Sequence, residues 1–253
     1  NIFDSGKDKF LKRQDVVIDL RGNFKSLWYA FSRGCQFYFD RGSVRLKNKY
    51  SGGQKQEVFT NHEIIEDLIG DTEFEYPKIQ LSDTEVINVD NWLKVNNLDK
   101  YVVMHTGAND PARRWPADRY IALAKYLFDK HALRTVLVGA PGEQDIVEAI
   151  ATHMGDFAYS AAGRFDLLEL AALCSKATLF VGNESGPVHV ATAMKTPLVA
   201  LFGPGVKKVF YPYHEKARIL HHFPGKSENK QLGGPVDLIT LDEVKMAIVS
   251  LAI

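Results

Sequence analysis

From residue 101 onward, the sequence alternates between short apolar runs and amphipathic helical segments, and this alternation leaves few possible folds. Apolar runs such as Tyr101–His105 and Leu198–Phe202 are typical of strands that are buried on both faces. The segment 117–130 carries apolar residues at helical spacing, with Pro116 suited to its first turn. Strands that alternate with helices across short loops predict βαβ units and a parallel sheet.

The same rhythm predicts the remaining elements of this part of the chain. Expected strands cover residues 135–138, 157–160, 179–181 and 219–220, and expected helices cover residues 143–154, 186–194 and the segment through Leu168, Ala171 and Ala172. Thr240 and Glu243 have the spacing of a capping box, which predicts a last helix after Thr240. Its inward-facing residues are expected to be Leu241, Val244, Ile248 and Leu251.

The region before residue 97 is less regular. Residues 16–20 and 36–40 predict two short strands, and residues 23–33 predict a helix between them. Residues 41–56 are basic and lack periodicity, so we expect a mobile loop there. Residues 57–69 predict an amphipathic helix, and Ser82 with Glu85 predicts a capping box that opens another. The apolar faces of these three helices are expected to be Phe24, Leu27, Trp28 and Phe31; Val58, Ile65, Leu68 and Ile69; and Val86, Val89 and Leu93.

The stretch 95–100 is polar and rich in Asn, which favours a domain boundary near residue 97. We therefore expect residues 1–97 to form a partial N-terminal domain. Residues 98–253 are expected to form a C-terminal Rossmann-like domain.

Composition excludes several classes of protein. Lys and Arg number 31 and Asp and Glu number 31, so the formal net charge is zero and no global field steers the chain to nucleic acid or an anionic membrane. An anion site must then be built locally. The two cysteines, Cys35 and Cys174, lack the CxxC spacing of a zinc site and fit a reducing cytoplasm. No apolar run approaches the ~18 residues of a membrane span.

Ligands of open parallel sheets bind at the carboxyl ends of the strands, and three strand ends carry informative residues. The strand that ends at His105 continues through Thr106 and Gly107 toward Arg113 and Arg114. Gly107 lets backbone N–H groups approach a ligand, and forked guanidinium donors neutralise phosphate. Two solvated arginines on a surface loop are the plain alternative. Their position after a strand favours a binding site.

The second strand end leads into Glu184, Ser185, Gly186 and Pro187. Ser185 suits an N-cap, and the helix that begins at Gly186 presents N–H groups that bind phosphate. Glu184 can accept hydrogen bonds from sugar hydroxyls. His189, one turn into the helix, is by itself more typical of a structural histidine. The third strand end leads to Glu143, an acid that suits ribose hydroxyls.

Several motifs are missing from the sequence. Neither GxGxxG after a strand nor GxxxxGKS/T occurs, which argues against nicotinamide dehydrogenases and P-loop proteins. GxSxG and HExxH are also missing. No DxD occurs, so metal-bridged diphosphate binding has no obvious ligands, and we expect neither a metal nor a cofactor. Arg side chains and helix N–H groups then have to stabilise an anionic leaving group.

Four segments, in order, carry a resemblance over nearly the whole chain. Residues 17–26 look like VIDLQGxxKS, residues 105–109 with 113–116 look like HPGAS followed by KRWP, residues 183–191 look like NDSGPMHLA, and residues 196–204 look like TPTIALFGP. The chain thus resembles glycosyltransferase family 9, the ADP-heptose:lipopolysaccharide heptosyltransferases. The resemblance implies an α/β, GT-B-like fold, in which two Rossmann-like domains with parallel sheets bind the acceptor and the nucleotide sugar. The family's first strand and Gly-rich loop, with the aspartate proposed as general base, have no counterpart here, so we expect an incomplete N-terminal domain.

The resemblance also implies roles and partners. It makes Arg113 the catalytic cation beside the diphosphate. The donor-binding residues that it implies, together with the strand ends above, are Thr106, Gly107, Arg114, Glu143, Glu184, Ser185, Gly186, Pro187 and His189. The implied reaction is inverting, metal-independent transfer of a sugar, heptose from ADP-heptose, to a lipid A/Kdo-type glycan acceptor of the lipopolysaccharide core. The implied location is the cytoplasm, where the protein could also attach peripherally to the inner membrane. Two alternatives stay open: a truncated or split non-catalytic sugar-nucleotide-binding protein, and a GT-B-like sugar-nucleotide epimerase.

Overall fold

The chain forms two compact units in a computed structural model that describes residues 16–20, 24–32, 34–51, 55–203, 211–222 and 234–252. The first unit extends to Tyr76, and the second begins at Pro77. Asn23, Arg33, residues 52–54 and Pro204 belong to segments interpreted above but lie outside the described residues.

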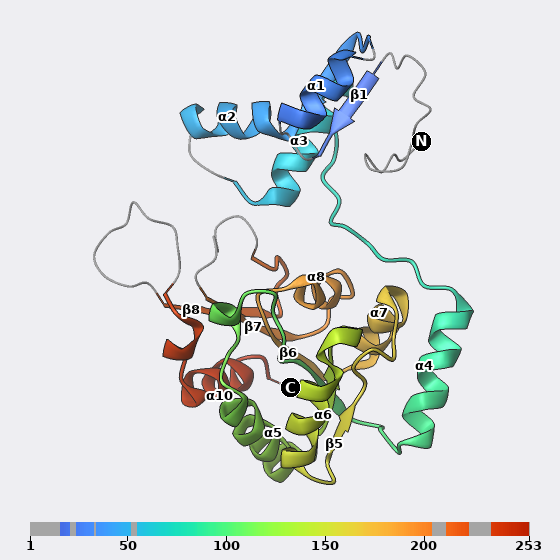
Figure 1. Ribbon diagram of the computed structural model, residues 1–253, viewed down its shortest axis with the longest axis vertical. Helices are drawn as coiled ribbons and strands as arrows, with labels where there is room; N and C mark the ends of the chain where they lie inside the picture. The colour runs from blue at the N-terminus through green and yellow to red at the C-terminus, as the bar shows by residue number, and fades with distance from the viewer. Residues whose placement is uncertain are drawn as a thin grey trace. The chain divides into compact units, whose positions relative to one another are not determined.

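The second unit is built on a six-stranded sheet in which every pair of neighbouring strands is parallel (Figure 1). The strand order is β5-β4-β3-β6-β7-β8. The strands are β3 (Tyr101–His105), β4 (Arg134–Val138), β5 (Ala158–Ser160), β6 (Leu179–Asn183), β7 (Leu198–Phe202) and β8 (Ala217–His221). Together with the helices that follow them, they confirm the predicted α/β class.

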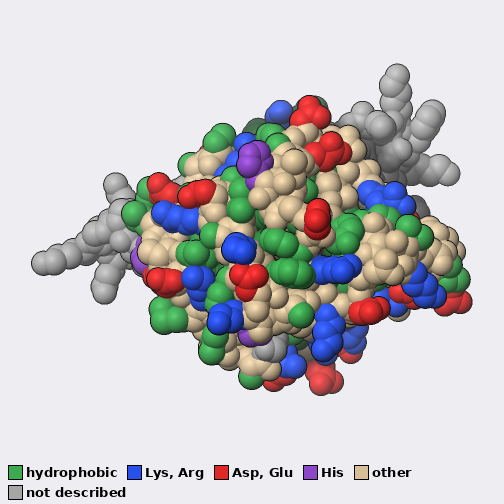
Figure 2. Space-filling view, turned by 90° about the horizontal axis from the view of Figure 1, so that it is seen from below, with side chains coloured by type: hydrophobic (Ala, Val, Ile, Leu, Met, Phe, Trp, Pro, Cys, Tyr) green, Lys and Arg blue, Asp and Glu red, His purple; other side chains and the backbone are tan. Residues whose placement is uncertain are grey.

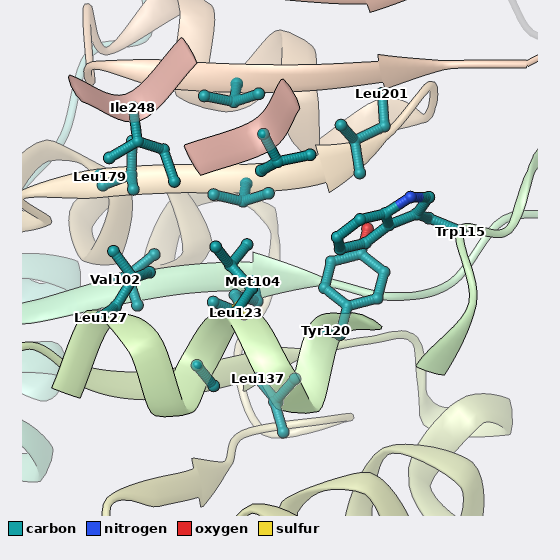
Figure 3. Packing of buried hydrophobic residues seen from close by; sticks show 14 of the residues in the cluster. Val102, Met104, Trp115, Tyr120, Leu123, Leu127, Leu137, Leu179, Leu201 and Ile248 are labelled. Carbon is teal, nitrogen blue, oxygen red and sulfur yellow. The ribbon is translucent and has the colours of Figure 1, made fainter. Parts of the chain in front are cut away.

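Helices cover both faces of this sheet because successive strand residues point to opposite sides. Val102 and Met104 of β3 pack under one set of helices, whereas Tyr101 and Val103 pack under the other. The first set is α5 (Ala117–His131), α6 (Gln144–Met154) and α10 (Leu241–Val249), and the second is α4 (Asp83–Val95), α7 (Leu167–Lys176) and α8 (Gly186–Ala193). Figure 3 shows the first core, with Leu123 and Leu127 of α5 against Val102 and Met104. Burial on both faces explains the continuous apolar runs of the strands.

The capping boxes predicted from sequence are present at two helix starts. Ser82 and Glu85 close the first turn of α4, and Thr240 and Glu243 close that of α10. Within α10 the predicted apolar face is buried at Val244 and Ile248, with Leu251 just beyond the helix.

The first unit contains a two-stranded parallel sheet, β1 (Val16–Asp19) and β2 (Phe37–Asp40), with helices α1 (Phe24–Ser32), α2 (Arg41–Ser51) and α3 (Glu57–Ile69). The predicted mobile loop at 41–56 is wrong, because α2 occupies most of it. Two of its basic residues, Arg41 and Arg45, form ion pairs with Glu57 of the neighbouring helix α3. Val44 and Asn48, one turn apart on α2, are both buried, so the helix has an inner face that the sequence interpretation missed.

Two predicted faces and one boundary also differ from the structure. Phe24, Trp28 and Phe31 of α1 are 79%, 65% and 62% exposed, and Ile69 of α3 is exposed while Ile64 is buried. The expected division near residue 97 differs from the structural one after Tyr76, because α4 packs against α7. Val89 of α4 joins the same apolar core as Leu173 of α7. Lys176 of α7 also pairs with Asp90, 2.6 Å away.

Charged side chains of both signs are mixed on the face of the molecule that Figure 2 presents, where Lys and Arg lie among Asp and Glu. This mixture agrees with the zero formal net charge of the whole sequence.

Candidate functional site

The strand order places one position of the sheet where a ligand is expected. Counted along the second unit, the order β5-β4-β3-β6-β7-β8 is 3-2-1-4-5-6, which reverses direction between β3 and β6. In open α/β sheets, the crevice outside the carboxyl ends of the strands at this switch point binds ligands. The residues at those ends are His105 of β3 and Asn183 of β6. Most residues singled out from the sequence therefore follow one of these two strands.

Asn183 ties together the segments around the switch point. Its side chain is fully buried, and its Nδ2 donates to the carbonyl oxygens of Thr106 at 2.8 Å and Gly107 at 3.2 Å. Its Oδ1 accepts from the backbone N–H of Trp115 at 3.0 Å and lies 3.1 Å from the Tyr120 hydroxyl. Because all of these partners are buried or inside the loop after β3, one amide fixes the path of that loop.

The loop after β3 is fixed at its far end as well. A short 3-10 helix, η1 (Pro111–Arg113), begins where Asp110 accepts from the backbone N–H of Ala112 at 3.0 Å. Trp115, only 2% exposed, donates from Nε1 to the carbonyl oxygen of Ile239 at 2.7 Å. Figure 3 shows the Trp115 ring beside Tyr120 in the apolar core. Arg113 is held in place by this frame.

Arg113 lies against Glu184, which follows β6. The Nη1 atom of Arg113 is 3.7 Å from Oε1 of Glu184, whose side chain is 6% exposed. Burial raises the pKa of Glu184, and the Arg113 charge partly opposes that rise. Within the described part of the chain, Nε of Arg113 and Oε2 of Glu184 are buried without hydrogen-bond partners. Buried polar atoms without partners are costly, so these two atoms mark a place suited to a polar ligand.

Glu143 closes the other side of the loop after β3. It ends the short 3-10 helix η2 (Pro141–Glu143), and its Oε2 accepts from the backbone N–H of Ala140 at 2.8 Å. Interaction with His105 is the largest cause that lowers the Glu143 pKa to about 2, with Ala140 and the Arg114 charge assisting against burial. The distance between His105 Nε2 and Glu143 Oε2 is 3.8 Å, longer than a normal hydrogen bond, and the contact is an ion pair only when the His105 ring is protonated.

Gly107 fits beneath this carboxylate only because it has no side chain. A Cβ at that position would lie 2.0 Å from Oε1 of Glu143. The carboxylate is the far end of a flexible side chain, so a larger residue at position 107 would displace it.

The first turn of α8 begins directly after Glu184. No side-chain hydrogen bond caps the helix, because the Ser185 hydroxyl lies 3.0 Å from His105 Nδ1 and donates to the Asn183 carbonyl oxygen at 3.0 Å. A Cβ built on Gly186 would meet no atom of the described residues within 4 Å, so among them the space beside the helix start is open. An uncapped start with open space beside it keeps the positive end of the helix dipole available.

Some of the predicted site residues lie against one another, whereas others contact different parts of the fold or solvent. Arg113 meets Glu184, and Glu143 meets Gly107. The exposed Arg114 donates from Nε to the carbonyl oxygen of Ala108 at 2.8 Å, so it fixes the loop as well as carrying charge. Pro187 occupies the first turn of α8, and His189 is exposed and makes no hydrogen bond or ion pair within the described residues.

Sequence reasoning missed His105 and Asn183 as structural parts of the site. Both were quoted within motifs, but neither was singled out. The available signal was a polar residue closing an otherwise apolar strand, since such a residue is buried only when hydrogen bonds satisfy it.

The described residues offer neither a metal-binding cluster nor a membrane-spanning helix. Among the residues that the structure describes, no group of three or more His, Cys, Asp and Glu side chains is placed to hold a metal ion. The helices of that same part of the chain are too short or too polar to cross a bilayer.

The fold is similar to those of several solved structures. A 22% identical glycosyltransferase family 9 structure from Veillonella parvula superposes with a TM-score of 0.78 over 95% of this chain and 74% of that one. The Escherichia coli ADP-heptose lps heptosyltransferase II structure, 24% identical, gives a TM-score of 0.73 over 94% of this chain and 76% of that one. By fold and strand order, the chain is thus an α/β protein of the Rossmann-like, GT-B class, as predicted.

The sequence comparison narrows this class to a family. Residues 8–233 match the model of glycosyltransferase family 9 (heptosyltransferase), so the chain belongs to that family. Lipopolysaccharide heptosyltransferase 2 of Escherichia coli is 31% identical over 155 residues, which cover 59% of this chain and 44% of the relative. The match to the corresponding Salmonella typhimurium protein also spans 44% of that relative. The chain therefore spans less than half the length of these curated relatives.

Proposed function

We propose that the second unit binds the donor of an inverting glycosyltransferase, which transfers heptose from ADP-heptose to the lipopolysaccharide core or a related glycan. Family membership supports sugar transfer. The Escherichia coli and Salmonella typhimurium relatives named above are lipopolysaccharide heptosyltransferases, and one is described by its donor, ADP-heptose. The observation that carries the proposal is the uncapped start of α8 beside the Arg113–Glu184 pair at the switch point of the sheet.

In this proposal the diphosphate accepts hydrogen bonds from the first turn of α8, where helix N–H groups and the helix dipole favour an anion. The guanidinium of Arg113 stabilises the charge that develops on the departing diphosphate. Arg114 adds positive charge, and Thr106 and Gly107 shape the loop that faces the ligand. Asn183 holds the backbone of Thr106 and Gly107 before any ligand arrives, so little reorganisation of this loop is needed.

The two carboxylates take separate roles. Glu184 accepts hydrogen bonds from hydroxyls of the donor sugar, which supplies a partner for its unpaired Oε2. Glu143 accepts from ribose hydroxyls. Ser185, Gly186, Pro187 and His189 form the helix start around the phosphates, with Pro187 presetting the backbone of the first turn.

The transfer step follows from this arrangement. The acceptor hydroxyl oxygen bonds to the anomeric carbon of the donor while the bond from that carbon to the diphosphate oxygen breaks. The bonding electrons leave with the diphosphate, and the hydroxyl proton passes to a general base beside the acceptor. Holding donor and acceptor in line, together with stabilising the leaving group, supplies the rate acceleration.

We further propose a cytoplasmic location, with the glycan acceptor presented at the inner membrane surface. The two cysteines support this part of the proposal, since both are free.

Calorimetric titration with ADP, UDP and GDP tests the donor site. We expect ADP to bind with the highest affinity and Arg113→Ala to weaken it by 1–3 kcal/mol, about 5- to 150-fold, because a charge-assisted contact is lost. Arg134→Ala is the matched control, since Arg134 is the first residue of β4 and so lies at the amino ends of the parallel strands, opposite the carboxyl ends where the site is. Unchanged ADP affinity in Arg113→Ala would remove Arg113 from the site.

Product analysis distinguishes sugar transfer from the two alternatives, an epimerase and a non-catalytic sugar-nucleotide-binding protein. Free ADP together with a glycosylated acceptor supports transfer, and an isomerised sugar nucleotide supports an epimerase. ADP-heptose binding without either product supports a non-catalytic binding protein or one half of a split enzyme.

A further inference from the structure

His105 lies beside two of the proposed donor-site residues, Ser185 and Glu143, and is not itself one of the proposed ligand contacts. Its side chain is only 5% exposed at the end of β3. One ring nitrogen, Nδ1, lies 3.0 Å from the Ser185 hydroxyl, and the other, Nε2, lies 3.8 Å from the Glu143 carboxylate. A single ring thus joins the segments that follow β4, β3 and β6.

The partners of the ring restrict its hydrogen bonding. Nε2 lies 3.8 Å from the Glu143 carboxylate, beyond hydrogen-bond range, so the contact that restricts the ring is the 3.0 Å approach of Nδ1 to the Ser185 hydroxyl. If Nδ1 carries no proton, the Ser185 hydroxyl donates to it in place of the Asn183 carbonyl oxygen. If the ring is charged, Nδ1 donates to that hydroxyl, which donates onward to the Asn183 carbonyl oxygen. In both states the Ser185 hydroxyl is engaged on the side of His105.

This engagement has a consequence for α8. Serine at an N-cap position normally accepts a hydrogen bond from a first-turn N–H group. Here the hydroxyl makes no such bond. Pro187 has no N–H, so the group that a released Ser185 hydroxyl would cap is the N–H of Val188, the third residue of the helix. That N–H now reaches only the backbone oxygen of Ser185, at 3.2 Å.

We propose that His105 is a positioning residue that holds the Ser185 hydroxyl away from the first turn of α8 and so keeps that turn open for a diphosphate. The inference rests on the proposed function, because the ligand is the donor's diphosphate. Glu143 faces the other ring nitrogen at 3.8 Å. Without His105, the protein's own serine competes with the ligand for the helix start.

Two substitutions of similar polarity separate the contacts of the ring. In His105→Asn the amide takes the place of Nδ1 and keeps a partner for Ser185. In His105→Gln the amide takes the place of Nε2, which keeps a partner for Glu143 and releases Ser185. We expect His105→Gln to raise the calorimetric Kd for ADP about fivefold, the equivalent of one N-cap interaction, and His105→Asn to stay within twofold of wild type.

The decisive control repeats the measurement without the hydroxyl. In a Ser185→Ala background, His105→Gln is expected to change the ADP affinity by less than twofold, because no side chain remains to cap α8. An equal loss in both backgrounds, or an equal loss for the Asn and Gln variants, overturns the proposal. Thermal unfolding of each variant verifies that it is folded at the titration temperature.

A ligand-free crystal structure keeps this test separate from the proposed function. In His105→Gln, we expect Ser185 Oγ within hydrogen-bond distance of the Val188 nitrogen. A hydroxyl that stays in its wild-type position overturns the positioning role, whether or not ADP binds. Failure of the wild-type protein to bind ADP would instead refute the proposed donor site, and the crystal structure would still decide the role of His105.

Discussion

Replacing Asn183 with alanine removes the side chain that joins the end of β6 to the loop after β3. Four contacts disappear: two to the carbonyl oxygens of Thr106 and Gly107, one from the Trp115 N–H and one with the Tyr120 hydroxyl. Each buried hydrogen bond contributes about 1 kcal/mol net, and a buried donor left without a partner costs about 1–3 kcal/mol. Because Trp115 is 2% exposed, water does not readily replace the lost acceptor.

We therefore expect Asn183→Ala to lower the free energy of unfolding of the second unit by about 3–5 kcal/mol. Urea denaturation followed by tryptophan fluorescence measures this change, since buried Trp115 lies at the altered contact. Asn88→Ala is the matched control, because Asn88 is exposed and makes one hydrogen bond to Glu169; a loss within about 0.5 kcal/mol is expected.

An isosteric variant separates hydrogen bonding from lost volume. Asn183→Asp keeps an acceptor for Trp115 and Tyr120 but places a second oxygen against the two carbonyl oxygens. It is expected to be strongly destabilised although its shape is unchanged. A loss below about 1 kcal/mol in both variants would refute the reasoning, because it would mean that the amide does not hold the loop.

Three further predictions concern Gly107, Glu143 and Thr240. Gly107→Ala places a Cβ 2.0 Å from Glu143 Oε1, so the carboxylate is displaced and an NMR titration is expected to show its pKa rising from about 2 toward its usual 4.5; an unchanged pKa contradicts the contact. The lowered pKa also means that ionised Glu143 stabilises the fold above pH 4.5 and that this contribution disappears as the pH falls toward 2; the difference in Tm between wild type and Glu143→Gln should shrink over that range, and a constant difference argues against it. Thr240→Ala removes the N-cap of α10 and is expected to cost about 1 kcal/mol in urea denaturation, whereas no change would contradict the capping box.

Much of the second unit was predictable because each of its elements carries its own local signal. The strand Tyr101–His105 has the bounds that its apolar run indicated, and the helix Ala117–His131 extends the predicted segment by one residue. Apolar runs, helical spacing and capping residues are all written within a few consecutive residues. The parallel sheet follows from their alternation.

The elements that sequence reasoning misjudged depend on partners far along the chain. Helix α2 packs against α3, where Arg41 and Arg45 contact Glu57, and Val44 on its inner face is buried. Burial of the α1 face was expected from its pattern, but Phe24 and Trp28 are exposed. A helical pattern predicts a face but does not supply the surface that covers it.

The candidate site shows the same division. Gly107, Arg113 and the start of α8 were expected from strand ends and turn chemistry, and the structure gathers them near the switch point of the sheet. The orientation of the Ser185 hydroxyl was not predictable, because it is set by His105, a residue 80 positions away. Serine before a helix ordinarily indicates a cap, and only the three-dimensional contact shows it engaged elsewhere.

A crystal structure of this chain with bound ADP tests the central claim most directly. We expect the diphosphate oxygens to accept hydrogen bonds from the N–H groups at the start of α8, with the Arg113 guanidinium within hydrogen-bond distance. A diphosphate bound elsewhere on the chain, with the helix start empty or covered by its own side chains, would contradict the account.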